Sequence, residues 1–262
     1  MYPTEEDIAK AKEYVLRRMG IQKNAETLIH KYMMEAAQRI YDISVKYNIP
    51  PKFFQFSHNK ELEKEVNEVI EWLAQMIMDI IESTVIAASE KDKGDILAYM
   101  AEMGDEYSIS ELIHIYTDRF KFEIEAFLAA GLAYNLSKAV IVEEIAKSLE
   151  KPYMSDLLQK AFKDSGFRAT RIITRGITYG VGQYTSSKNA INRLENATAG
   201  IIWWWWWSSN MKRDGASFFY QMRGSSYPCQ ICDDLVGIYP ISDIDKEYPH
   251  AHCYCIRVPI YV

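Results

Sequence analysis

The sequence predicts an α+β protein that is mostly α-helical and carries a small antiparallel β-sheet near its C-terminus. Through the N-terminal half, apolar residues recur every three or four positions, which indicates amphipathic helices. After Gly200 this period gives way to short apolar and aromatic runs typical of strands. All 4 cysteines lie between Cys229 and Cys255, where a zinc knuckle is expected to close the sheet. We therefore expect a helical domain over 1–151 and a second domain over 152–262.

Helices account for the expected N-terminal domain. The first should span 5–47, with a bend or interruption at Gly20, and Pro50 and Pro51 should end it because proline cannot continue a helix. Ser108 and Glu111 have the spacing of a capping box, which opens a further helical segment. Helices are expected over 59–89, 95–103, 108–150 with a break allowed at Gly131, and 153–164.

The second half begins with a long basic stretch over 167–199, expected to be mainly helical. It carries Arg168, Arg171 and Arg175 in its first turns. Strands are then expected over 201–207, 217–223 and 256–262, the last of them pairing back onto the sheet.

Five consecutive tryptophans, Trp203 to Trp207, form the core of the expected strand over 201–207. In a strand, Trp203, Trp205 and Trp207 would share one face. Three interpretations stay open: a strand buried on both sides, a protein-interaction patch, or a platform on which nucleic-acid bases stack.

Charge is distributed unevenly. The net charge is -6, but residues 1–150 hold 17 basic and 27 acidic side chains, whereas residues 151–262 hold 13 and 9. The acidic half is not expected to bind DNA broadly, whereas the basic half suits a phosphate backbone or an acidic protein surface. Two solvated surfaces of opposite sign would give the same balance.

Two features of the chain bear on its compartment. No apolar run approaches the roughly 20 residues of a membrane span, so no membrane association is expected. The first residues lack the basic and apolar regions of a signal peptide, so we expect a cytoplasmic protein at first. In that reducing compartment, clustered cysteines favour metal binding over disulfides.

The cysteines form two clusters, Cys229 with Cys232 and Cys253 with Cys255. A Cys-x-x-Cys turn offers two sulfurs to one tetrahedral zinc ion, and a second ligand pair about 20 residues later completes such a site. Along an extended chain, Cys253 and Cys255 would point the same way, so four sulfurs can meet. His250 and Cys255 compete for the fourth position, His252 is least favoured, and free cysteines in a core are the alternative without metal.

Neither enzyme class with a similar motif fits this pattern. A zinc deaminase has Pro-Cys-x-x-Cys together with an upstream His-x-Glu, and no upstream histidine here has Glu two residues later. A thioredoxin-like site needs a helix after the motif, and Asp233, Asp234, Gly237 and Pro240 speak against one. We expect a non-enzymatic protein without a small-molecule substrate.

The order of motifs over residues 166–262 resembles the Mu F-like family of phage minor head proteins, which act in head morphogenesis. The resemblance rests on Arg168-Ala-x-x-Ile172-x-x-Arg175, an aromatic run, Pro228-Cys-x-x-Cys232-x-x-Leu235-x-Gly237, and His250-x-x-Cys253-x-Cys255 followed by Pro259. The chain departs from the family pattern at Gly176, Ile177, Val236, Ala251 and Tyr254.

The resemblance implies a structural zinc ion and a place in the virion. The family pattern favours Cys229, Cys232, His250 and Cys253 as ligands, with Cys255 as the substitute. It also implies a location in the capsid interior near the portal, after assembly in the host cytoplasm. The implied partners are the portal, other capsid or scaffold proteins, and packaged DNA. The Trp run and the basic helix are the candidate contact surfaces.

A second hypothesis comes from the basic stretch alone. Arg168, Arg171 and Arg175 would also suit a cytoplasmic zinc-containing module that binds nucleic acid, with an affinity that falls steeply as salt rises.

Overall fold

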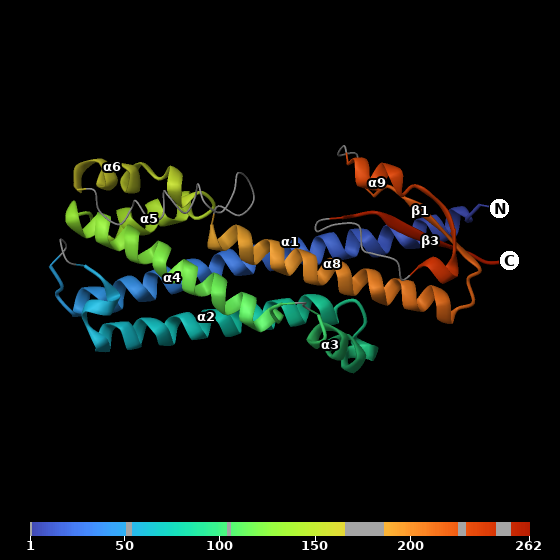
Figure 1. Cartoon of the computed structure of the whole chain (residues 1–262), viewed down its shortest axis with the longest axis horizontal. Helices are drawn as coiled ribbons and strands as arrows, with labels where there is room; N and C mark the ends of the chain where they lie inside the picture. The colour runs from blue at the N-terminus through green and yellow to red at the C-terminus, as the bar shows by residue number, and fades with distance from the viewer. Residues whose placement is uncertain (1, 51–53, 104–105, 166–185, 225–228, 245–252) are drawn as a thin grey trace. The chain divides into compact units, whose positions relative to one another are not determined.

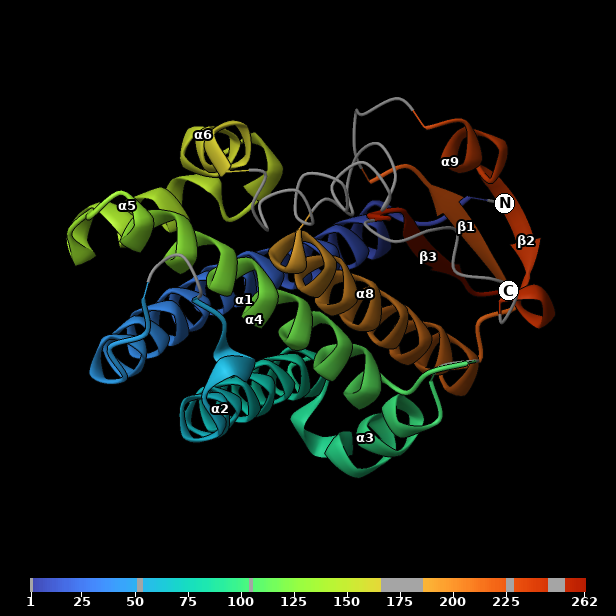
Figure 2. The ribbon, with the colours of Figure 1, turned by 60° about the vertical axis from the view of Figure 1, so that its left-hand side comes forward.

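The computed structural model describes residues 2–50, 54–103, 106–165, 186–224, 229–244 and 253–262. It confirms a mostly helical α+β protein with a small antiparallel sheet. Figure 1 labels its elements apart from β2, which is labelled in Figure 2. The helices are α1 (Glu5–Lys46), α2 (Lys60–Ile86), α3 (Lys93–Ala101), α4 (Ile109–Ala133), α5 (Lys138–Ser148), α6 (Asp156–Ser165), α8 (Ser187–Arg213) and α9 (Gln230–Asp234), and the strands are β1 (Phe218–Met222), β2 (Gly237–Pro240) and β3 (Ile256–Ile260).

The chain packs into two compact units built from interleaved segments. The sheet unit comprises Met1–Glu26, Ile81–Met103 and Arg193–Val262, and the helical unit comprises Thr27–Ile80 and Gly104–Asn192. The domain boundary expected between residues 151 and 152 is a different partition of the chain and stays a prediction.

Of the two expected helix interruptions, one is absent and the other lies at a different position. α1 continues through Gly20 without a break, so the expected interruption there is wrong. The segment from Ser108 does divide, but at 134–137, where Asn135 adopts a left-handed backbone with φ 54. Asparagine tolerates that conformation better than most residues. Gly131 stays inside α4, where the side chain of Ile141 from α5 packs against it.

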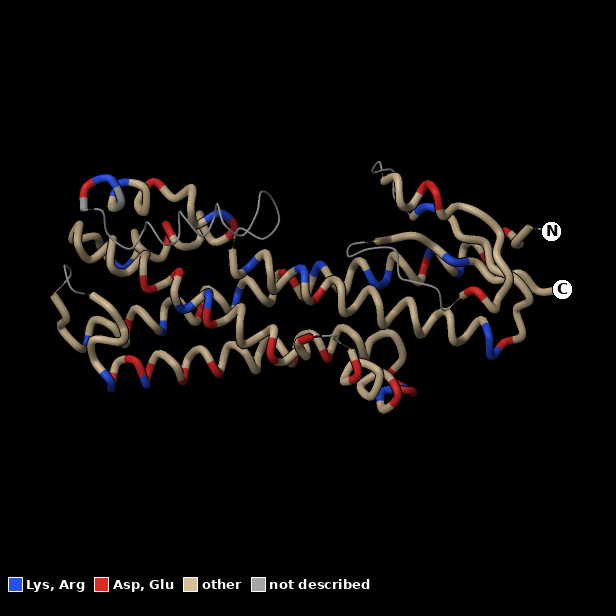
Figure 3. The backbone as a smooth tube through the Cα atoms, in the orientation of Figure 1, with Lys and Arg blue, Asp and Glu red and all other residues tan. Residues whose placement is uncertain are grey.

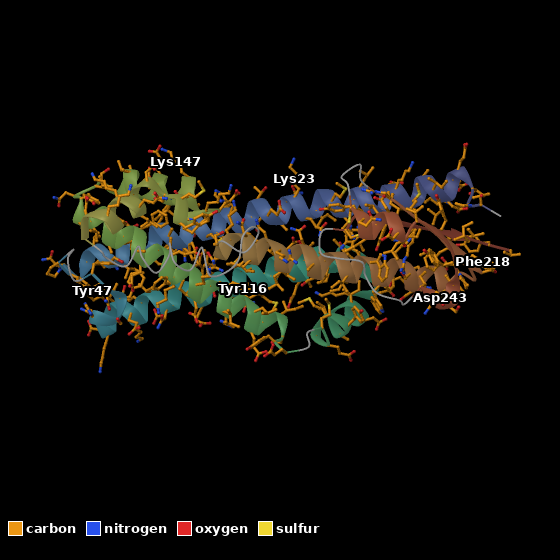
Figure 4. The ribbon with its side chains drawn as sticks, turned by 45° about the horizontal axis from the view of Figure 1, so that its top comes forward. Lys23, Tyr47, Tyr116, Lys147, Phe218 and Asp243 are labelled. Carbon is orange, nitrogen blue, oxygen red and sulfur yellow. The ribbon has the colours of Figure 1, made fainter. Side chains whose placement is uncertain are left out.

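Caps and side-chain hydrogen bonds fix the ends of helices in the helical unit. The capping box at Ser108 is present, with both Ser108 and Glu111 bonded to the other's backbone N–H. The Tyr47 hydroxyl, at the end of α1, donates to Glu65 of α2 (Figure 4). At the start of α8, the buried carboxylate of Glu123 accepts from the Ser187 backbone N–H at 3.0 Å and from its hydroxyl at 2.5 Å. The contacts at Ser108 and Ser187 satisfy backbone N–H groups that the start of a helix leaves unpaired.

Acidic side chains mark the exposed side of α2. Acidic positions recur along this helix (Figure 3), and Glu61, Glu68 and Glu71 are exposed there, whereas Leu62, Val66 and Leu73 are fully buried. The apolar stripe expected for this helix is therefore its core face. Within the described residues, no helix is long and apolar enough to cross a membrane.

The sheet of the sheet unit has the order β2-β1-β3, with both pairs antiparallel (Figure 2). The strand expected over 217–223 is β1, and the final strand pairs with it as expected, with Phe218 opposite Ile260. One face of the sheet packs on α1, where Val258 of β3 meets Ala11. On the other face, Phe219 of β1 packs against Met211 of α8.

The five tryptophans lie in α8, so the strand expected over 201–207 is wrong. A helix directs successive side chains about 100° apart, and here every direction meets another element. Trp203 is fully buried and donates its Nε1–H to the Thr84 carbonyl of α2 at 2.9 Å. Trp205 stacks on Tyr99 of α3, with ring centroids 4.3 Å apart, and Trp207 stacks on Tyr14 of α1. Intrinsic strand preference is worth only tenths of a kcal/mol per residue, and this packing overrides it.

Two helical glycines give opposite predictions for the same substitution. A Cβ at Gly131 would lie 2.5 Å from two Ile141 side-chain atoms, whereas a Cβ at Gly20 would meet nothing within 4 Å. We expect Gly131→Ala to lower the free energy of unfolding by about 1–3 kcal/mol through overpacking. Gly20→Ala should raise it by about 0.5–1 kcal/mol, because alanine favours the helix. Urea denaturation followed by circular dichroism measures both, and equal effects of the two substitutions would contradict this packing.

Candidate metal centre

The first cysteine pair lies at the start of the short helix α9. Cys229 is its N-cap residue, and the Cys229 carbonyl accepts the first helical hydrogen bond from the Asp233 N–H at 3.0 Å. Cys232 lies three residues later, on the same side of this turn. Cys232 is buried and Cys229 is half-buried against it. One turn of helix thus presents both sulfurs together.

The second pair lies on the extended segment that leads into β3. Cys253 and Cys255 are both buried and join Cys232 in one cluster. Tyr254, between them, packs instead with the cluster that includes Ala11 of α1. The two sulfurs therefore share one side of the chain, as expected from the alternation of an extended backbone.

The sulfur atoms are spaced as one metal ion would require. The Sγ atoms of Cys232, Cys253 and Cys255 all lie within 4.8 Å of one another, and that of Cys232 lies 3.9 Å from that of Cys253. Sulfurs about 2.3 Å from a tetrahedral zinc ion lie about 3.8 Å from each other. With Cys229 packed beside them, this cluster could hold a metal ion.

Burial and hydrogen bonds with neighbouring sulfurs keep the thiols of Cys232 and Cys255 protonated in the absence of metal. Burial raises the pKa of Cys232 to about 12, and hydrogen bonds with Cys255 and Cys229 add to the shift. A hydrogen bond with Cys253, followed by burial, raises the pKa of Cys255 well above that of a free thiol. A metal ion binds thiolates, so binding here must release protons and must weaken as the pH falls.

Backbone N–H groups and one arginine surround the sulfurs. The Cys255 N–H donates to the Cys253 Sγ at 3.4 Å, and the Gly224 N–H acts on the Cys255 sulfur, where it favours the thiolate. Arg223 pairs with Asp233 of α9, and the charges of Cys232 and Cys229 also favour its ionised form. These groups would offset the negative charge that several thiolates bring to one ion.

Gly224, just after β1, lies very close to the segment that carries the second cysteine pair. Continuing the register of β1 and β3, it lies opposite Tyr254. A Cβ at Gly224 would lie 1.5 Å from the Tyr254 carbonyl oxygen and 2.4 Å from its carbon. Only glycine permits the two backbones to approach this closely.

Arg18 of α1 holds the cysteine segment from the other side. Its side chain is buried, donates to the Cys253 carbonyl at 2.6 Å, and lies over the Tyr254 ring at 5.1 Å. Nothing in the spacing of the motifs pointed to this residue, since 235 positions separate it from Cys253.

The sequence motifs did not identify Arg257 of β3 either. Its buried guanidinium donates to the Gln221 side chain at 3.0 Å and to the Ser208 hydroxyl at 3.1 Å, and it lies 3.4 Å from the centroid of the Trp204 ring. It ties β3 to β1 and α8 directly after the last cysteine.

The other predicted site residues divide into two groups. His250, His252, Arg168, Arg171 and Arg175 lie outside the described residues. Trp203, Trp205 and Trp207 are described, and all three contact residues within the sheet unit, with Trp203 fully buried. Of the three interpretations of the Trp run, core packing agrees with these contacts.

The expectation that no helix accompanies the Cys-x-x-Cys motif is also wrong. α9 spans Gln230–Asp234, with Gly237 already in β2. Asp233 lies in the first turn of α9, where negative charge meets the N-terminal dipole. The helix is only 5 residues long and leads into an antiparallel strand.

Comparison with known proteins gives no match: no family model, curated protein or solved structure matches this chain.

Two glycines beside the sheet provide a matched test of the site. We expect Gly224→Ala to lower the free energy of unfolding by roughly 2 kcal/mol or more, because the new methyl group displaces the Tyr254 backbone. It should also weaken metal binding by moving Cys255. Gly237→Ala is the control, since its Cβ would meet only ordinary contacts at 3.4 Å. Urea denaturation and zinc titration with a colorimetric chelator measure both effects, and equal behaviour of the two variants would contradict this role of Gly224.

Proposed function

We propose that this protein is a non-enzymatic phage minor head protein that acts in capsid assembly, with a structural zinc ion that fastens its C-terminal sheet. The observation that carries the proposal is the cysteine cluster. The motifs behind the resemblance to the Mu F-like family, Cys-x-x-Cys and Cys-x-Cys, are the segments whose sulfurs meet.

Zinc is the metal that this ligand set suits best. Four thiolates in a tetrahedral arrangement favour zinc over hard cations, which bind oxygen. We assign Cys229, Cys232, Cys253 and Cys255 as the ligands, because three of these sulfurs already form one cluster and the fourth packs against it. His250, which the family pattern favours, is then the rival of Cys255.

This ligand set argues for a structural role. Four protein ligands fill the coordination sphere of zinc and leave no position for an activated water. The ion would join α9, which leads into the edge strand β2, to the start of the other edge strand, β3. The sheet has only 3 strands. So small a sheet has little stability of its own, and the metal would supply part of it.

The proposed location is the capsid interior near the portal, and the proposed partners are portal, capsid or scaffold proteins and packaged DNA. These proposals rest on the resemblance over residues 166–262. The alternative of a free nucleic-acid-binding module has no described residue in its favour, because its basic stretch lies outside the described ranges.

Metal content distinguishes the two ligand sets. Protein purified under reducing conditions should contain one zinc ion per chain by elemental analysis. His250→Ala should retain it, whereas Cys255→Ser should lose most of it, because oxygen is a poor substitute for thiolate. Chelation should also abolish the near-ultraviolet circular dichroism of the Trp-rich packing. Loss of zinc from His250→Ala with retention by Cys255→Ser would instead support the set with His250.

Capsid incorporation tests the proposed role. When the chain is expressed with the portal and major capsid proteins encoded at its own locus, we expect it to co-sediment with assembled heads. A double Cys229→Ser and Cys232→Ser variant should be lost from the heads, whereas Glu143→Gln, an exposed change on α5, should be retained. Heads that never contain the wild-type chain, or a locus without portal and terminase genes, would count against the role.

A further inference from the structure

Glu195 of α8 is a buried acid without a good hydrogen-bond partner. Glu195 is 0% exposed, and neither of its carboxylate oxygens accepts a hydrogen bond from any described residue. The Thr84 hydroxyl of α2 lies near the carboxyl and favours its ionised form, an effect smaller than that of burial. An ionised carboxylate in such a place loses its hydration and gains nothing equivalent in return.

The charged groups that face Glu195 come from α1. Glu26 opposes its ionisation, and Arg18 favours it. Tyr254 is a further titratable neighbour: burial raises its pKa most, the Arg18 charge lowers it, and the charges of Glu26 and Glu195 add to the rise. A second carboxylate close to a buried acid favours the protonated form, since two like charges cannot both be solvated there.

Arg18 makes no hydrogen bond with Glu195, because its terminal nitrogens face backbone carbonyls and its Nε–H has no partner among the described residues. One terminal nitrogen donates to the Cys253 carbonyl at 2.6 Å and the other approaches the Gly200 carbonyl at 3.5 Å. Glu26 likewise accepts from the Asn196 side chain at 2.9 Å. The contacts that join α1 to α8 therefore surround Glu195 without including its carboxyl group.

We propose that Glu195 is a proton-operated switch in the packing of α1, α2 and α8: the carboxyl is protonated in the folded protein at neutral pH, and its ionisation weakens this packing. The neutral acid is the form that is buried at least cost where the carboxyl accepts no hydrogen bond. Ionised Glu195 would also compete with the Cys253 carbonyl for the Arg18 guanidinium. The switch is thereby placed beside the cysteine segment, but it does not depend on the identity of the metal.

The pKa of Glu195 in the folded and in the unfolded chain determines how the stability changes with pH. Burial raises the pKa of Glu195 to about 8, and the Glu26 charge adds to this, from an ordinary value of 4.5. The folded protein then holds the proton more tightly than the unfolded chain. Between these two pKa values, stability falls as the pH rises, and above about pH 8 the loss is complete.

The test compares Glu195→Gln with the wild type by urea denaturation at several pH values from 6 to 9. Glutamine has the same shape and never ionises. We expect the ratio of the folding constants, variant over wild type, to rise at least about tenfold across this range. Contributions of the cysteines and of Glu123, whose pKa burial raises to about 7, are common to both proteins and cancel in the ratio.

A spectroscopic readout and two further variants complete the design. The infrared difference between wild type and Glu195→Gln at pH 7 should contain the C=O stretch of a protonated carboxylic acid, and this band should vanish as the pH rises. Glu13→Gln, an exposed change on α1, is the control and should give a constant ratio. If Glu195→Gln fails to fold, Glu195→Leu replaces it under the same criterion. A ratio that stays constant from pH 6 to 9, or absence of the carboxylic acid band, would overturn the proposal.

Discussion

The sheet unit depends on the packing of the tryptophan run of α8. A sheet of 3 strands is stable only when it buries a hydrophobic face, and here helices pack on both of its faces. α1 covers one face and α8 the other, and Trp207 of α8 packs against the apolar clusters on both faces. Trp203 bonds to α2, Trp205 stacks on α3, and Trp207 donates to the Arg257 carbonyl of β3 at 2.8 Å. These large aromatic side chains, buried or half-buried, supply apolar surface to the core of this unit.

The cysteine cluster lies at the edge of this packing and extends it. α9 and the segment before β3 have few large apolar side chains of their own, so sulfur ligands are a suitable way to join them. Gly224 permits the close approach, and Arg18 fixes the Cys253 carbonyl from α1. The proposed metal ion would then act on a site whose backbone is already positioned from two sides. That arrangement suits a structural fastener better than a reactive centre.

Sequence patterns located the elements well wherever the pattern was repetitive. The helical period found α1 and α2, the capping box at Ser108 found the start of α4, and alternation placed the sulfurs of Cys253 and Cys255 on one side. Gly20 was misjudged because glycine weakens a helix by only about 1 kcal/mol, which the packing of a long helix easily exceeds. β2 was missed because its 4 residues carry no period of their own.

The sequence alone determined the fold class and the two cysteine pairs, because both depend on residue spacing along one segment. It could not determine the state of Trp203 to Trp207, since an unbroken apolar run has no period and suits a strand or a buried helix equally. Only the tertiary structure decided that α1, α2, α3 and β3 surround this run as a helix. The same holds for Arg18 and Glu195, whose environments come from segments far apart in the chain. Burial and charge at such positions are properties of the folded protein, which no local pattern encodes.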